Sequence, residues 1–253
     1  IKSCLDLCVE KNDHIITIDP TFAMVDIYSK IKRVKQIKIK YDQNLKLDVK
    51  KIFKIIRNKK ISLIIIANPN SPTVTIVPQK TLLSLVKTCE KKNIVVLVDE
   101  AYYGFYKGTL IKKINRFKNL IISRTFSKAF GLAGCRVGFL ATNNNLAQKL
   151  YNLRPMYEIN SIGVLAAQEI LKNLKVVKKY VNEQIKAKNY FLRELKKRKI
   201  EYLDSYANFI YVDFKNKKKF AEKYFLNENI LIKGSLGIKR YENFLRISLG
   251  PRS

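Results

Sequence analysis

Histidine and cysteine, the side chains that most often bind metal ions in proteins, are scarce in this sequence. His14 is the single histidine, and no two of the four cysteines, Cys4, Cys8, Cys89 and Cys135, form a C-x-x-C pair. This pattern excludes a clustered zinc site, so we expect no metal ion. We interpret the four cysteines as reduced thiols of a cytoplasmic protein.

Long hydrophobic runs are absent as well. No stretch of about 18 or more apolar residues occurs, which argues against a transmembrane helix. The opening residues, IKSCLDLCVEKND, lack the charged, apolar and small-residue regions that make up a secretory signal. We therefore expect a protein that neither spans nor enters a membrane.

Acidic residues are few, since 20 Asp and Glu stand against 50 Lys and Arg, for a formal net charge of +30. Such a charge would suit a nucleic-acid-binding protein. However, the lysines are spread over residues 30–60, 172–199 and 215–223, and they do not form a zinc-finger, RNP or basic-zipper pattern. We interpret them as solvated helix faces. We expect no specific nucleic-acid partner, although non-specific attraction at low salt follows from the charge.

Hydrophobic residues are plentiful: they make up 47% of the 253 residues, enough for one sizeable α/β core and a smaller domain. The runs that predict strands are HIITID (14–19), QIKIKY (36–41), SLIIIAN (62–68), NIVVLVDE (93–100), NLIISRTF (119–126) and RVGFLAT (136–142). Between them, residues 45–58 and 78–92 have helical spacing, with Pro78 in a first turn. The alternation predicts a mostly parallel sheet with flanking helices.

A second region follows a lysine-rich stretch with helical spacing, predicted as one long helix over residues 171–198. Beyond it we expect strands at 208–214, 230–233 and 244–249 and a helix at 220–226, which together make a small α+β domain. We therefore divide the chain into a large cofactor-binding domain, residues 1–170, and a linking helix with a small C-terminal substrate domain, residues 171–253.

Polar side chains follow several of the predicted strands. Asn68 comes after the run SLIIIA, Asp99 ends NIVVLVD and precedes Tyr102 closely, and Lys128 follows the strand NLIIS. Each has an ordinary explanation alone, as a turn residue, a helix cap or a surface lysine. However, ligands of open α/β sheets bind beyond the carboxyl ends of the strands. An amide, a carboxylate, a phenol and an amine at that edge together predict a site.

Four motifs occur in order along the chain: ANPNSPT, VDEAYYGF, SRTFSKAFGLAGCRVGF and NFLRISLG. Together they resemble the pyridoxal-phosphate-dependent aminotransferases of fold type I, and most closely those that act on histidinol phosphate. The resemblance covers essentially the whole chain. It implies bound pyridoxal 5'-phosphate, a homodimer, and small-molecule substrates, namely an amino donor and a 2-oxo acid acceptor. The implied reaction transfers the amino group of histidinol phosphate to 2-oxoglutarate in histidine biosynthesis.

The resemblance also implies roles for the residues at the strand ends. Lys128 is the amine that bonds to the coenzyme aldehyde and later moves the substrate proton. Asp99 holds the pyridine nitrogen protonated, so that the ring can accept electrons. Asn68 and Tyr102 donate hydrogen bonds to the phenolic oxygen of the ring, and Phe22 stacks on the ring face. For Phe22, a place in the hydrophobic core is the alternative.

Further residues match the family's anion-binding positions. Arg136, with Ser127 and Thr125, corresponds to the group that binds the cofactor phosphate. Arg246 corresponds to the arginine that clamps the substrate α-carboxylate. Lys233 stands where histidinol-phosphate enzymes carry an arginine that helps to hold the substrate phosphate, and we expect it to face the far end of the substrate.

The sequence departs from the family in two further respects. Val74 stands in NPNSPTV where the family commonly has glycine, so we expect a shifted turn after Asn68. The chain also begins inside a predicted helix and stops soon after Arg246. We therefore expect that an N-terminal segment of the family, which contacts the cofactor phosphate and reaches the partner subunit, is missing.

Other functions use similar residues. Aminotransfer from aromatic amino acids and decarboxylation of threonine phosphate rely on the same cofactor-binding set. A basic protein that binds RNA without a cofactor is the more distant alternative. Weak pyridoxal-phosphate binding together with tight, salt-sensitive RNA binding would favour that alternative.

Overall fold

The computed structural model describes residues 1–234 and 236–251. Its larger part is built on a six-stranded sheet with the order β2-β1-β3-β4-β5-β6. The strands are β1 (His14–Asp19), β2 (Lys35–Lys40), β3 (Leu63–Ala67), β4 (Val95–Asp99), β5 (Leu120–Thr125) and β6 (Gly138–Ala141). All pairs are parallel except β5 with β6, which is antiparallel. This confirms the predicted, mostly parallel sheet.

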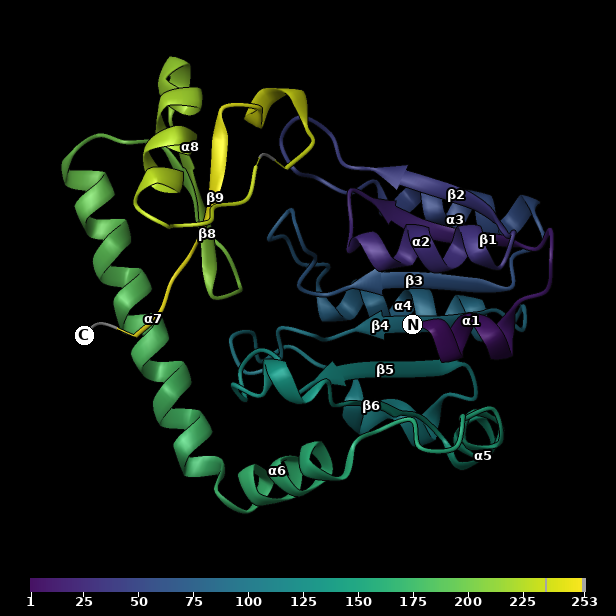
Figure 1. Cartoon of the computed structure of the whole chain (residues 1–253). Coiled ribbons are helices and arrows are strands. Elements are labelled where there is room, and N and C mark those ends of the chain that lie inside the picture. The colour runs from purple at the N-terminus through teal and green to yellow at the C-terminus, as the bar shows by residue number, and fades with distance from the viewer. Residues whose placement is uncertain (235, 252–253) are drawn as a thin grey trace.

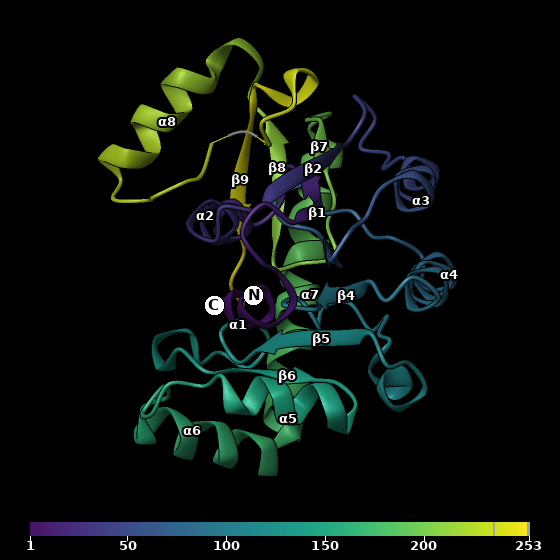
Figure 2. The same cartoon turned by 90° about the vertical axis from the view of Figure 1, so that its right-hand side faces the viewer.

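Helices cover both faces of this sheet (Figures 1 and 2). On one face lie α1 (Lys2–Cys8), α2 (Ala23–Ile31) and α5 (Asn144–Asn152), and on the other lie α3 (Val49–Asn58) and α4 (Gln79–Glu90). Pro78 is the residue just before α4 rather than part of its first turn, where its fixed φ of −56° still suits the helix start. Two helix layers around a parallel sheet bury its strands on both sides.

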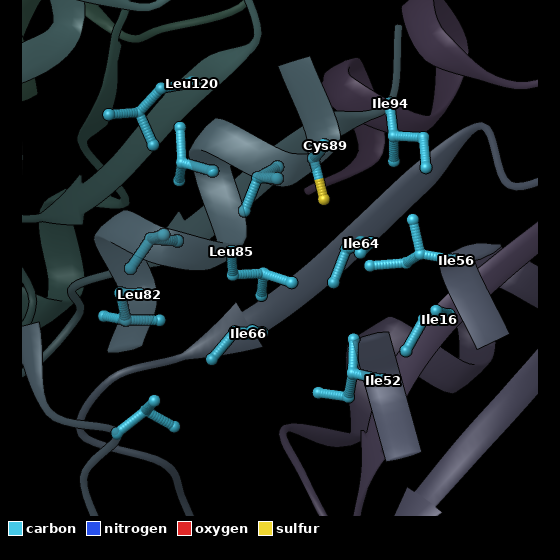
Figure 3. Close-up of a cluster of buried hydrophobic side chains, with 14 of the residues drawn as sticks. Ile16, Ile52, Ile56, Ile64, Ile66, Leu82, Leu85, Cys89, Ile94 and Leu120 are labelled. Atoms are coloured by element: carbon cyan, nitrogen blue, oxygen red, sulfur yellow. The ribbon is translucent and has the colours of Figure 1, made fainter. Parts of the chain in front are cut away.

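Successive residues of each central strand point into opposite layers. Ile64 and Ile66 of β3 belong to the cluster that contains Ile52 of α3 and Leu85 of α4 (Figure 3), whereas Ile65 packs with α1. This is why the strand LIIIA has no polar position and all five residues are buried. Burial of one such side chain stabilises the fold by about 1.5–3 kcal/mol.

The C-terminal part consists of three α-helices and a small sheet. Its elements are α6 (Ser161–Lys172), α7 (Leu174–Lys197), β7 (Tyr202–Leu203), β8 (Phe209–Asp213), α8 (Lys218–Asn227) and β9 (Phe244–Ser248). The strands form an antiparallel sheet in the order β7-β8-β9. The carboxyl ends of the parallel strands of the large sheet point toward α7 and this small sheet (Figure 1).

The long helix predicted over residues 171–198 is confirmed as α7. It begins at Leu174, because Asn173 adopts non-helical angles (φ −113°, ψ 43°) and bonds back to Glu169. One predicted strand of this region was wrong. The run 230–233 forms no strand: Leu231 is 87% exposed, and only Lys233 pairs, in an isolated bridge with Arg246. Apolar composition had suggested a strand, but no neighbouring strand covers this segment. The predicted domain boundary at residue 170 falls in the last turn of α6 and stays a prediction.

Several structural features bear on the chemistry expected of the chain. All four cysteines are free. Within residues 1–234 and 236–251, no group of three or more His, Cys, Asp or Glu side chains could hold a metal ion. Across the same residues, every helix is too short or too polar to cross a membrane.

Candidate active site

Three neighbouring parallel strands bring the predicted polar residues to one edge of the large sheet. In the strand register, Ala67 lies opposite Asp99, and Asp99 lies opposite Ser123. The backbone N–H of Asn68 donates to the Asp99 carbonyl over 2.8 Å, which fixes Asn68 beside the end of β4. The parallel sheet thus places Asn68 and Asp99 side by side, as the strand-end argument predicted, and adds Ser123 beside Asp99.

Asp99 is held by two hydrogen bonds. Ser123 Oγ donates to Asp99 Oδ1 over 2.8 Å, and the backbone N–H of Ala101 donates to the same carboxyl group. Burial raises the pKa of the Asp99 carboxyl above its ordinary value, and the two hydrogen bonds oppose that rise. A protonated ring nitrogen beside this carboxylate would supply the positive partner that favours its charged form.

Lys128 follows β5 in a tight turn. The Ser127 N–H donates to Thr125 Oγ1 over 3.0 Å, and the Gly131 N–H donates to the Lys128 carbonyl over 3.0 Å. The next residue, Ala129, is buried against Gly104 so closely that a Cβ on Gly104 would lie 2.6 Å from the Ala129 Cβ. Glycine at position 104 is therefore required for the turn to pack where it does.

The Lys128 amine lies in a half-buried, cation-rich place, 5.5 Å from the centre of the Tyr102 ring. Burial lowers the pKa of Lys128, and the charges of Arg246, Arg136 and Lys233 lower it further. Arg136 is eight residues from Lys128 along the chain, whereas Lys233 and Arg246 come from the C-terminal part. An amine with a lowered pKa loses its proton more readily and becomes nucleophilic.

The predicted phosphate-binding group lies along the end of β5 and the loop before β6. Thr125 Oγ1 accepts the Ser127 N–H, as above, and approaches the Val137 carbonyl at 3.4 Å. Arg136 is exposed and in the left-handed conformation (φ 57°), and its Nη1 donates to the Ala133 carbonyl over 3.1 Å. Its other guanidinium N–H groups are available to an anion.

The loop after β3 holds Asn68 rigidly. Asn68 is 2% exposed, and its side-chain amide donates to the Val77 carbonyl over 3.2 Å and accepts the Val77 N–H over 2.7 Å. One N–H of that amide remains for a ligand. Val74 adopts φ 60°, the left-handed conformation that glycine favours, so the turn accommodates the valine at a cost in backbone strain.

Tyr102 and Phe22 differ in their exposure. Tyr102 is 5% exposed, packs edge-on against Phe209 with the ring centres 5.7 Å apart, and bonds through its hydroxyl to Ser71. Phe22 precedes α2 and is 48% exposed, so it is not a core residue. Its neighbour Thr21 donates to Asn70 over 2.8 Å and ties this segment to the loop after β3.

The small sheet contributes Arg246 and Lys233. The Arg246 N–H donates to the Lys233 carbonyl over 2.9 Å, so the two residues are directly opposed. The Arg246 guanidinium lies 4.5 Å from the centre of the Phe209 ring, and its buried Nε has no hydrogen-bond partner among the described residues. Buried polar atoms are almost always bonded in native proteins, so an unpartnered guanidinium N–H marks a place for an acceptor.

Sequence reasoning missed three residues of this region. Ser123 was recognised only as the end of a strand, and its bond to Asp99 depends on the register of β4 and β5. Glu100 and Arg124, the next residues along these strands, form a buried ion pair over 2.8 Å. A charged residue directly after an apolar strand was the available signal, but nothing local identified its partner.

The chain is similar in sequence to known aminotransferases. The family model described as aminotransferase class I and II matches residues 1–253. The chain is 33% identical over 252 residues to a histidinol-phosphate aminotransferase of Clostridium novyi, with 96% of this chain and 67% of the relative covered. A relative of the same name from Buchnera aphidicola is also 33% identical, with 96% and 69% covered.

Solved structures agree in fold. The structure of histidinol-phosphate aminotransferase from Sinorhizobium meliloti in complex with pyridoxal-5'-phosphate superposes with a TM-score of 0.88 at 22% identity, covering 99% of this chain and 69% of that one. The enzyme of the same name from Clostridium acetobutylicum gives a TM-score of 0.85 at 23% identity, covering 99% and 76%. The chain belongs to the aminotransferase class I and II family.

Proposed function

We propose that this protein binds pyridoxal 5'-phosphate and transfers the amino group of histidinol phosphate to 2-oxoglutarate. The observation that carries the proposal is the strand register that brings Asn68 and Asp99 to one sheet edge, with the half-buried Lys128 amine 5.5 Å from the centre of the Tyr102 ring. Bound cofactor supplies the ring that accepts electrons when the substrate loses its α-proton. The residues present suit that group, because they include a buried carboxylate for its ring nitrogen and free guanidinium donors for its phosphate.

Each side chain then has a definite task. Asp99, fixed by Ser123, holds the proton on the ring nitrogen. Arg136, Thr125 and Ser127 hold the cofactor phosphate at the end of β5. Asn68 and Tyr102 orient the ring through its phenolic oxygen, and the exposed ring of Phe22 covers its face. Lys128, with its lowered pKa, takes the substrate proton at one carbon and returns it at the next.

The bridge between Lys233 and Arg246 changes the expected arrangement of the substrate. Directly opposed residues of antiparallel strands have Cβ atoms about 4.5–5.5 Å apart, so these two cations do not suit opposite ends of a substrate. Histidinol phosphate carries its phosphate ester on the carbon next to the amine-bearing carbon, where glutamate carries its α-carboxylate. We therefore place both cations at one anion site, which takes the phosphate of one substrate and the carboxylate of the other.

A panel of amino donors tests the proposal. Protein loaded with pyridoxal phosphate should show a near-visible absorption band, and histidinol phosphate should convert it to the spectrum of the amine form faster than tyrosine or phenylalanine does. Borohydride reduction followed by peptide mass spectrometry should place the cofactor adduct on Lys128, and Lys128→Ala should remove the band. An adduct on another lysine would refute the assignment of Lys128. A preference for the aromatic donors would move the assignment to an aromatic aminotransferase.

We also propose that the protein acts as a homodimer in the cytoplasm, as the family resemblance implies. An apolar surface runs over the stretch from the end of α5 into α6 and supports the dimer. Its exposed side chains are Tyr151 (65%), Leu153 (46%), Met156 (78%), Tyr157 (92%), Ile162 (78%) and Leu165 (65%). Exposed large apolar side chains that gather on one part of a protein mark interaction surfaces. Sedimentation equilibrium of the wild type and of Ile162→Asp measures the dimer, and a wild-type monomer at micromolar concentration would contradict it.

A further inference from the structure

Behind the Asp99–Ser123 pair, on the other face of the sheet, lies a buried ion pair. Residues of β4 and β5 alternate between the two helix layers: Leu97 and Ile121 pack toward α1, whereas Val98 and Ile122 pack toward α3 and α4. By the same alternation, Asp99 and Ser123 face the first layer, and the next residues on the two strands, Glu100 and Arg124, face the second. The ends of β4 and β5 therefore carry the Asp99–Ser123 hydrogen bond on one face of the sheet and the Glu100–Arg124 ion pair on the other.

The ion pair is two-pronged and nearly dry. Arg124 Nε and Nη2 donate to Glu100 Oε2 over 3.0 and 2.8 Å, and the side chains of Arg124 and Glu100 are 11% and 2% exposed. The Arg124 guanidinium also stacks on Tyr103, 3.4 Å from the ring centre. The arrangement therefore joins the end of β4, the turn that follows it and the end of β5.

Further hydrogen bonds tie the pair to the loop before β5. Thr109 Oγ1 donates to Glu100 Oε2 over 2.8 Å and accepts from Arg124 Nη2 over 2.9 Å. The Leu110 N–H donates to Glu100 Oε1 over 3.1 Å. A buried polar network satisfied in this way is rigid, and removal of one charged member leaves the other charge uncompensated.

A Glu100 carboxylate without its Arg124 partner would repel the carboxylate of Asp99. Glu100 is its neighbour along the chain, and in a nearly water-free place the two carboxylates would repel each other. Arg124 cancels that repulsion, and its two-pronged bond holds β4 and β5 at the register in which Ser123 reaches Asp99. Arg124 thus influences both the charge near Asp99 and the position of Asp99, although it lies on the opposite face of the sheet.

We propose that Arg124 is a positioning residue for Asp99: paired with Glu100, it locks the ends of β4 and β5 and neutralises the charge behind the carboxylate that faces the cofactor ring. The role toward the ring rests on the proposed function, but the effect on Asp99 belongs to this chain alone. The groups that face Asp99 from other elements are the Cys4 thiol of α1 and the Tyr102 hydroxyl. They stay unchanged in the variants below.

The test is the titration of the Asp99 carboxyl in cofactor-free protein, followed by carbon NMR with aspartate labelled at the side-chain carboxyl and assigned with Asp99→Asn. Arg124→Met should raise the Asp99 pKa, because the Glu100 charge is then uncompensated. Glu100→Gln should lower it, because a buried guanidinium then stands alone. The double variant should return the pKa to near the wild-type value. Equal or same-direction shifts in the two single variants would refute the proposal, since a merely structural role predicts no opposite signs.

Arg124→Lys covers the case in which Arg124→Met fails to fold. It keeps the charge and loses the two-pronged bond, so the Asp99 pKa should shift much less than in Arg124→Met while the melting temperature falls. A shift as large as that of an uncharged variant would contradict the charge argument. In the loaded enzyme, Arg124→Met should lower kcat by about tenfold with little change in KM, and the double variant should recover part of that loss. Wild-type protein that bound no pyridoxal phosphate would refute the proposed function, while the cofactor-free titration would still decide this inference.

Discussion

Ser123 Oγ donates a hydrogen bond of 2.8 Å to Asp99 Oδ1 across the parallel pair of β4 and β5. The bond favours the charged form of a carboxyl whose pKa burial raises. Asp99→Asn should retain the cofactor but lower kcat by about 100-fold or more, since an amide cannot hold the ring nitrogen charged.

Ser123→Ala should lower kcat by roughly tenfold, most strongly at the acid end of the pH profile, because loss of the bond raises the Asp99 pKa further.

Stopped-flow measurement of amino-group transfer as a function of pH checks both variants. Ser84→Ala on the exposed face of α4 is the matched control, and it should behave as the wild type. Wild-type turnover in Asp99→Asn would remove Asp99 from the mechanism.

Lys128 should make the stability of the cofactor-free protein change with pH in the alkaline range. Burial and neighbouring cations lower its pKa from 10.5, so the native state binds the Lys128 proton less tightly than the unfolded state does. The resulting destabilisation is complete below the lowered pKa, and it disappears as the pH rises past 10.5. Lys128→Met should therefore raise the melting temperature at pH 7. That gain should shrink as the pH approaches the ordinary lysine value.

Thermal unfolding monitored by circular dichroism between neutral pH and the alkaline limit measures this effect. Lys107→Met, at an exposed position of the neighbouring loop, should show no such pH dependence. A gain that stays constant with pH would mean that only the apolar contacts of the new methionine stabilise the variant.

At position 74 the usual stability ranking, in which an alanine variant is more stable than a glycine variant, should be reversed. Val74 is 5% exposed and adopts φ 60°, so it combines buried methyl groups with backbone strain. Val74→Ala keeps the strain and loses packing, which should cost about 1.5–3 kcal/mol. Val74→Gly loses slightly more packing but relieves about 1–2 kcal/mol of strain, so it should be at least as stable as the alanine variant.

Urea unfolding of both variants measures the difference. The same substitutions at Val86, buried in the regular helix α4, provide the control, and there glycine should be less stable than alanine by about 1 kcal/mol. The same ranking at both positions would show that the turn relaxes around Val74 without strain.

Lys233 should discriminate between phosphorylated and carboxylate donors. A charged hydrogen bond is worth about 1.5–3 kcal/mol, so Lys233→Ala should raise the KM for histidinol phosphate by about 10- to 100-fold. The effect on glutamate should be much smaller, because Arg246 alone can clamp a monovalent carboxylate. Lys233→Arg should be neutral or improve the phosphate substrate. Values of kcat/KM for both donors, with Lys239→Ala as an exposed control in the same domain, decide the matter. Equal losses for both donors would assign Lys233 to the fold.

The positions of the strands along the chain and the residue types at their ends could be read from the sequence, because they depend on local patterns. The strand HIITID was predicted with the bounds of β1, and the remaining runs overlap β2 to β6 within a residue or two. Buried parallel strands are continuous apolar runs, and a polar residue after such a run must lie at the sheet edge. The family, the fold and the enzyme class followed from these motifs and are confirmed.

The contacts that give the site its electrostatics depended on the tertiary structure. Lys233 pairs with Arg246 although its segment forms no strand, and Arg124 finds Glu100 only because β4 and β5 are in one particular register. No local pattern specifies these partners, since each pair joins segments that are far apart along the chain. Local patterns in the sequence specify which chemical groups stand at the strand ends. The register of the strands and the burial of the side chains decide which of those groups face one another, because register and burial, unlike propensity, are properties of the assembled fold.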